Sequence, residues 1–171
     1  LLGVTPMADS STVIARFEHV AATKPARVAV FWGREKITYG ELQRRANACA
    51  AHLQSHTGIR KGDRVGILLK NSPEFIYALY AALKSGANVV PINTFLKAPE
   101  IQHITDDCQL RCLISSVDFA PVTDNLQRVT ILPINELTAA TADANASWPA
   151  LSPADLAVII YTSGTTGKSK G

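Results

Sequence analysis

Residues 161–171, with the sequence YTSGTTGKSKG, combine the chemical groups that bind phosphate. Gly164 and Gly167 permit positive φ angles and a close approach of the backbone to a ligand. Hydroxyl and lysine side chains between and beside these glycines add hydrogen-bond donors and positive charge. Because each hydrogen bond to a charged partner contributes about 1.5–3 kcal/mol, a few of them are enough to hold a triphosphate.

The apolar run LAVII, residues 156–160, precedes this loop and must position it. Its β-branched composition predicts a buried parallel strand that Tyr161 closes. A flexible Gly/Ser/Thr tail is one alternative to a phosphate site, and the P-loop of kinases and GTPases is another. The P-loop requires Gly, four residues and then Gly-Lys-Ser/Thr. The Gly-Lys-Ser end of that motif fits residues 167–169, but the position of its first glycine, five residues before Gly167, is Thr162, so the spacing argues against a P-loop.

The loop resembles the phosphate-binding signature of the adenylate-forming (AMP-binding) superfamily, whose common form is YTSGTTGxPKG. This superfamily includes acyl-CoA synthetases, aryl-CoA ligases, firefly-luciferase-like enzymes and peptide-synthetase adenylation domains. The chain departs from the common form at Ser169, where proline is usual, and this frees φ and adds an N–H donor. Two earlier segments also resemble the family: KITYGEL at 36–42, and a second core block that runs from KGDRVGILL at 61–69 through LKSGANVVPIN at 83–93.

The segment NTFLK at 93–97, followed by Pro99 and Glu100, resembles fatty-acyl and aryl-CoA ligases more than peptide-synthetase domains. The resemblance implies an enzyme that attacks the α-phosphate of ATP with a carboxylic acid. The products are acyl-AMP and pyrophosphate, and a thiol such as coenzyme A then displaces AMP. The loop would hold the β- and γ-phosphates while charge moves onto them. The implied ligands are Thr162, Ser163, Gly164, Thr165, Thr166, Gly167, Lys168 and Lys170.

The same resemblance implies that other parts of the active site follow residue 171. These parts are the glutamate associated with magnesium, the aspartate that binds ribose, most of the acyl pocket, and a C-terminal domain with the adenylation lysine. We therefore expect residues 1–171 to be the N-terminal portion of the large AMP-binding domain, with no catalytic residue and no acyl-CoA synthetase activity alone. The alternatives are a stand-alone nucleotide-binding or interaction module of the same fold and, against its spacing, a Walker-type phosphotransferase.

The 171 residues, 47% hydrophobic and 18% charged, predict a globular domain with a substantial core. The net charge is +3, and the dispersed Lys and Arg residues favour anionic nucleotides over nucleic acid as partners. No apolar stretch approaches the ~20 residues that span a bilayer, and no signal peptide is evident, so a cytoplasmic location is expected. Cys49, Cys108 and Cys112 form no CxxC pair and are predicted to be free thiols.

Alternating helical and strand patterns predict an α/β domain with a mostly parallel sheet and flanking helices. Such sheets bind ligands beyond the carboxyl ends of their strands, where the loop after Tyr161 is expected. His52 and His56 could share a helix face, although solvated helix-end histidines are favoured over a metal site. The expected helices span 12–23, 38–58, 72–86, 98–107 and, weakly, 117–127; the expected strands span 28–32, 35–38, 64–69, 88–92, 111–115 and 129–134.

Three local features complete the sequence expectations. Thr38 and Glu41 have the spacing of a capping box at a helix start. Residues 1–11 are expected to be a flexible leader. Residues 135–155, rich in Ala, Thr, Asn and Ser, are expected to be an exposed connection.

Overall fold

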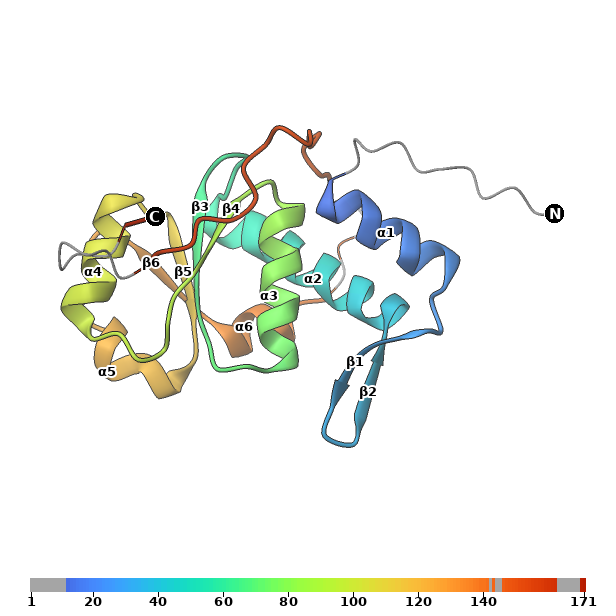
Figure 1. Ribbon diagram of the computed structural model, residues 1–171, viewed down its shortest axis with the longest axis horizontal. Coiled ribbons are helices and arrows are strands. Elements are labelled where there is room, and N and C mark those ends of the chain that lie inside the picture. Colours follow the sequence, from blue (N-terminus) through green and yellow to red (C-terminus); the bar gives the residue numbers. More distant parts are fainter. Residues whose placement is uncertain (1–11, 142, 144–145, 163–169) are drawn as a thin grey trace.

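A four-stranded parallel sheet with the strand order β4-β3-β5-β6 forms the centre of the molecule (Figure 1). The computed structural model describes residues 12–141, 143, 146–162 and 170–171. A separate antiparallel hairpin of two strands projects from the body. These elements confirm the predicted α/β domain. The strands are β1 (Val28–Trp32), β2 (Glu35–Thr38), β3 (Arg64–Leu68), β4 (Asn88–Pro91), β5 (Cys112–Ser115) and β6 (Thr130–Pro133).

Helices lie on both sides of the sheet (Figure 1). On one side are α1 (Val13–Thr23), α2 (Tyr39–Thr57), α3 (Pro73–Lys84) and α6 (Ile134–Ala139). On the other side are α4 (Ala98–Asp107), the 3-10 turn Val117–Phe119 and α5 (Ala120–Thr123). The four sheet strands therefore carry apolar side chains on both faces, as parallel sheets require.

The central strand β3 divides the core into two layers. Val65 and Ile67 point into the cluster under α2 and α3, whereas Leu68 belongs to the cluster under α4. Between them, Gly66 brings the strand backbone close to the second layer. A Cβ at Gly66 would lie only 2.8 Å from Leu113 Cδ1 and 3.0 Å from Leu110 Cδ1. The close approach of strand and side chains thus depends on the absence of a side chain at this position.

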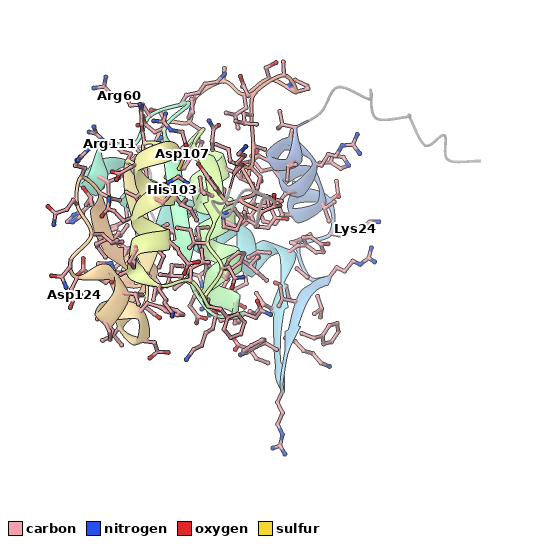
Figure 2. All side chains as sticks on the ribbon, turned by 60° about the vertical axis from the view of Figure 1, so that its left-hand side comes forward. Lys24, Arg60, His103, Asp107, Arg111 and Asp124 are labelled. Atoms are coloured by element: carbon pink, nitrogen blue, oxygen red, sulfur yellow. The ribbon has the colours of Figure 1, made fainter. Side chains whose placement is uncertain are left out.

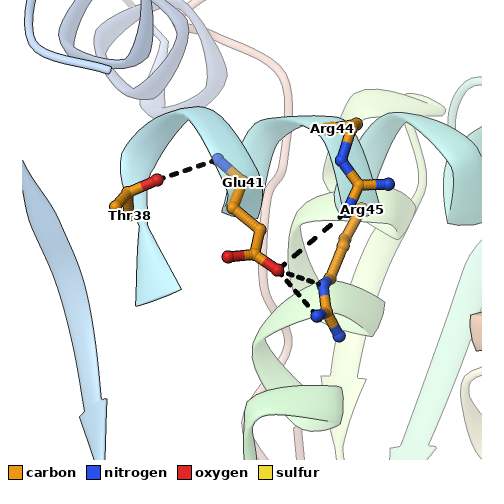
Figure 3. Close-up of polar contacts among 4 residues, drawn as sticks. All are labelled: Thr38, Glu41, Arg44 and Arg45. Atoms are coloured by element: carbon orange, nitrogen blue, oxygen red, sulfur yellow. Dashed lines mark hydrogen bonds and ion pairs between the residues drawn. The ribbon is translucent and has the colours of Figure 1, made fainter. Parts of the chain in front are cut away.

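Helix α2 begins with half of the predicted capping box (Figure 3). Thr38 Oγ1 accepts a hydrogen bond from the Glu41 amide at 3.2 Å, as predicted. The reciprocal half was wrong, because Glu41 Oε1 instead accepts from Arg45 Nη2 at 2.7 Å and lies 4.0 Å from Arg44 Nη2. A charge-assisted bond to a guanidinium one turn away replaces the bond to a neutral amide.

The segment 135–155 is not an exposed connection throughout, which corrects the sequence expectation. Its first residues belong to α6, and Leu137 is completely buried against the cluster that contains α2 and α3. Farther along, Trp148 and Leu151 are partly buried against the same cluster. Ile134 and Leu137 lie three residues apart on one helix face, and together they pack one helical turn against the cluster. The polar residues around them hide this short apolar pattern in the sequence. Residues 1–11 lie outside the described part of the chain.

Replacement of Leu137 by alanine should destabilise the fold by about 2–5 kcal/mol, because it opens a cavity at a fully buried position. The measurement is the free energy of unfolding in urea. Leu156→Ala is the matched control, since Leu156 is 56% exposed and its truncation should change the unfolding free energy by less than about 0.5 kcal/mol. Equal effects of the two substitutions would contradict the docking of α6.

Candidate phosphate-binding loop

The run that leads to the loop lies at the outer edge of β4 and forms one parallel bridge, between Val89 and Val158. The Val89 amide donates to the Ala157 carbonyl, and the Ile159 amide donates to the Val89 carbonyl, both at 2.8 Å. Leu156, Val158 and Ile160 remain exposed, at 56%, 37% and 66%. The predicted parallel pairing is confirmed at this one bridge, but the predicted burial is wrong for the described residues. An edge position gives the run one strand neighbour and leaves these three side chains uncovered by the described part of the chain.

The chain just before this run is tied to the body of the domain. Lys61 Nζ contacts Asp155 Oδ2 at 2.6 Å and donates to the Ala150 carbonyl at 2.8 Å. The hydrogen bond from Lys61 and a second one from the Ser152 amide lower the pKa of Asp155 below its ordinary value. Because Lys61 belongs to the turn before β3, this contact sets the point at which the run reaches the sheet edge.

The base of the loop is closed by a short antiparallel pair between Thr162 and Lys170. The Thr162 amide donates to the Lys170 carbonyl at 3.0 Å, and the Lys170 amide donates to the Thr162 carbonyl at 3.1 Å. The structure thus brings together the first and the last of the predicted phosphate ligands. The other predicted ligands lie outside the described residues and stay predictions: Ser163, Gly164, Thr165, Thr166, Gly167 and Lys168.

Tyr161 and Gly171 flank this closed base and pack on each other. A Cβ at Gly171 would lie 2.7 Å from Tyr161 Cε2 and 2.8 Å from Ile159 Cγ2, so only glycine fits against the tyrosine ring. The Tyr161 hydroxyl donates to Asp107 Oδ2 at 2.5 Å. Burial and then this carboxylate raise the pKa of Tyr161 above its usual range. Burial likewise raises the pKa of the neighbouring Cys108 thiol.

The contact with Asp107 places the Tyr161 hydroxyl at the end of α4, on the side of the amino ends of β3 and β5. Asp107 is the last residue of α4, and the next carbonyl, that of Cys108, accepts a 2.6 Å bond from Arg64 Nε at the start of β3. Figure 2 shows Asp107 near Arg111, which precedes β5, at the end of the molecule that carries Arg60. The parallel bridge between Val89 and Val158 directs the run toward the carboxyl end of β4. The expected position of the phosphate ligands beyond the carboxyl ends lies outside the described residues and stays a prediction.

Sequence reasoning missed Asp107 and Cys108 as neighbours of the loop. Asp107 looks like an ordinary acidic residue near a helix end, and 54 positions separate it from Tyr161. The only sequence signal for such a neighbour is Tyr161 itself, because the hydroxyl of a partly buried tyrosine usually has a hydrogen-bond partner. The position of that partner depends on where the edge run leaves the sheet.

The remaining candidate groups show no assembled second site. His52 and His56 share a helix face as predicted, and their rings stack at 5.1 Å between centroids. Among the described residues, no group of three or more His, Cys, Asp or Glu side chains could hold a metal ion. The three cysteines are free thiols, and burial raises the pKa of Cys49 to about 11 and that of Cys112 to about 12. Over the same described residues, no helix is both long and apolar enough to cross a bilayer.

Comparisons with known proteins identify the family. Residues 17–171 match the family of AMP-binding enzymes. Malpinin synthetase of Mortierella alpina is 38% identical over 165 residues, which cover 95% of this chain and 2% of that protein. A long-chain-fatty-acid–CoA ligase of Mycobacterium tuberculosis is 39% identical over 146 residues, which cover 80% of this chain and 29% of the ligase.

The solved structures agree with this assignment. An artificially fused Adenylation-PCP di-domain NRPS from Klebsiella oxytoca, NpsA-ThdA, superimposes with a TM-score of 0.85 at 34% identity. The match covers 94% of this chain and 32% of the solved one. The chain thus has the fold of an adenylation-enzyme N-terminal region and belongs to the AMP-binding enzyme family. It spans less than a third of the ligase it matches.

Replacement of Tyr161 by phenylalanine should loosen the loop base, because it removes the hydrogen bond to Asp107. If the hydrogen bond stabilises the closed base by about 1 kcal/mol, its loss should make the Thr162 and Lys170 amides exchange with solvent roughly three- to tenfold faster. NMR-detected hydrogen exchange measures this. Tyr39→Phe, which alters a tyrosine at the start of α2, should leave both amides unchanged. Unaltered exchange in Tyr161→Phe would show that the Asp107 contact does not hold the base.

Proposed function

We propose that the chain is the N-terminal portion of the large domain of an ATP-dependent carboxylate–CoA ligase. One observation carries the choice of CoA ligase: the 39% identity to the long-chain-fatty-acid–CoA ligase spans 146 residues. The segment at 93–100, which resembles fatty-acyl and aryl-CoA ligases, supports the same choice. The substrate would then be a fatty or aryl acid.

The proposed reaction has two steps. A carboxylate oxygen attacks the α-phosphate of ATP, the bond to the β-phosphate oxygen breaks, and pyrophosphate leaves. The sulfur of coenzyme A then attacks the acyl carbon, and AMP leaves with the electron pair of the broken bond. In the first step negative charge accumulates on the departing phosphates, where fixed donors and cations stabilise it most.

The loop residues of this chain would supply those donors. Gly164 and Gly167 would let backbone amides approach the phosphates, and Lys168 would add positive charge. The two hydrogen bonds between Thr162 and Lys170 support this role, because they hold both ends of the loop together. The proposal rests on the loop sequence and the family match rather than on the position of the base beside Asp107.

The rest of the activity is proposed for parts of the protein beyond this chain. The magnesium ligand and the adenylation lysine are expected after residue 171, and the described residues offer no cluster that could hold a metal ion. No catalytic residue is assigned within residues 1–171. A cytoplasmic location stays a prediction from the sequence. A non-catalytic nucleotide-binding or interaction module of the same fold is the alternative.

A second candidate function shares the first chemical step and differs in the thiol. The similarity to malpinin synthetase covers 165 residues, more of this chain than the ligase match does, and a solved Adenylation-PCP di-domain has the same fold. In that case the acyl group would pass to the thiol of a carrier protein instead of coenzyme A. The acyl-accepting thiol therefore separates the two candidates.

The test is to incubate the whole protein with ATP, magnesium and a panel of fatty and aryl acids, and to identify the products by mass spectrometry. We expect acyl-CoA when coenzyme A is present, and no product from residues 1–171 alone. Hydroxylamine trapping of acyl-AMP without any acyl-CoA would favour the carrier-protein candidate. Absence of both products for every acid would favour the non-catalytic module, and activity of the isolated chain would contradict its assignment as a portion of the enzyme.

A further inference from the structure

The β1–β2 hairpin carries two large aromatic side chains at its outer end. It projects away from the sheet and helices (Figure 1). The inner part of the hairpin is anchored, since Ile37 is completely buried and Val30 packs against the cluster under α2 and α3. At the other end, immediately before the Gly33 turn, Phe31 is 70% exposed and Trp32 is 46% exposed. Neither side chain packs into the core of the described residues, and two large exposed aromatic rings at one projecting tip mark a candidate interaction site.

The strand register places the two aromatic side chains on opposite faces of the ribbon. Phe31 pairs with Lys36, and Trp32 pairs with Glu35, so neighbouring positions in each strand point in opposite directions. A flat surface that packs against one face of the hairpin would cover only one of them. Insertion of the tip into a soft medium covers both.

The tip, residues 31–36, carries two basic side chains and one acidic side chain. Arg34 lies in the turn, and Lys36 Nζ lies 6.0 Å from the centre of the Phe31 ring. Glu35 is the one acidic residue of the hairpin. Nearby acids are already paired, because Glu41 binds Arg45 and Glu18 binds Lys84. Two further cations, Lys24 and Arg27, lie near the base, and in the described part of the chain none of the four basic side chains forms an ion pair.

We propose that this tip, Phe31 to Lys36, docks reversibly on an anionic lipid surface. Aromatic rings favour the boundary between headgroups and acyl chains, and Arg and Lys beside them attract acidic headgroups within about one Debye length. Two aromatic side chains bury about 150–250 Å² each, well below the ~800 Å² per partner of a standard protein interface. The small apolar area fits weak membrane docking better than a stable protein complex, and the inference does not depend on the proposed enzymatic reaction.

The chain contains two tryptophans, which makes a direct optical test possible. Within residues 1–171, Trp148→Phe leaves Trp32 as the only tryptophan, and the test uses this chain. Vesicles of phosphatidylcholine with about one-third phosphatidylserine should shift Trp32 emission to the blue and allow its quenching by brominated acyl chains, and pure phosphatidylcholine should do so much less. Raising the salt concentration to about 1 M should weaken the response, because the Debye length falls to about 3 Å. An unchanged spectrum, or an equal response to neutral vesicles, would overturn the proposal.

Vesicle co-sedimentation of variants with intact Trp148 provides the second measurement. The double substitution Phe31→Ser and Trp32→Ser should lower binding to anionic vesicles by at least about tenfold, because it removes both inserted rings. Arg34→Gln with Lys36→Gln should lower binding to anionic vesicles only. Phe95→Ser is the matched control, since Phe95 is 90% exposed but lies after β4, and it should bind like wild type.

Each variant is first compared with wild type by thermal unfolding, so that a loss of binding is not a loss of fold. A loss of binding in Phe95→Ser as large as in the hairpin variant would overturn the assignment to this tip. Concentration-dependent self-association that disappears with the hairpin substitutions, in the absence of lipid, would show instead that the tip contacts a second copy of the chain.

Discussion

Burial of β3 on both faces is the constraint on which the rest of the structure depends. Its side chains alternate between the cluster under α2 and α3 and the cluster under α4, and β4 and β5 flank it on either side. Gly66 lets Leu110 and Leu113 pack directly onto the strand backbone. Because β4 and β5 occupy the two edges of β3, any later strand can join the sheet only beside β4 or beside β5. β6 joins at β5, and the run 156–160 meets the free side of β4.

The geometry of the candidate site follows from that edge position. The run before the loop has one strand partner, and its pairing ends after a single bridge. Tyr161 then packs partly into the cluster under α4 and bonds with Asp107, while Gly171 lies against its ring. The Thr162–Lys170 pair therefore sits on the α4 side of the sheet. The loop base is held by contacts with α4 rather than by continuation of the strand.

Features that depend on local chemistry could be predicted from the sequence. The hairpin bounds agree because Gly33 adopts a positive φ of 59° at the turn. Helix α2 ends at Thr57 because the next residue, Gly58, adopts the left-handed cap conformation with a φ of 66°. Features that depend on competition between two hydrogen-bond partners, or on residues far away in the sequence, could not be predicted. Glu41 binds the Arg45 guanidinium instead of the backbone at its own helix start, and Leu137 packs a single helical turn into the core. Asp107 accepts a hydrogen bond from Tyr161, which lies 54 positions later in the chain. The position of the loop base depends on this last contact, and no local pattern encodes it.

The family assignment and the loop chemistry meet in one claim, that this loop holds the phosphates of ATP during adenylation of a carboxylic acid. The most direct test is carboxylate-dependent exchange of labelled pyrophosphate into ATP by the whole protein. Lys168→Ala should lower the exchange rate by about a hundredfold or more, since it removes positive charge from the departing phosphates. Lys70→Ala removes an exposed lysine paired with Asp118 and should leave the rate unchanged. Full exchange activity in Lys168→Ala would contradict the claim.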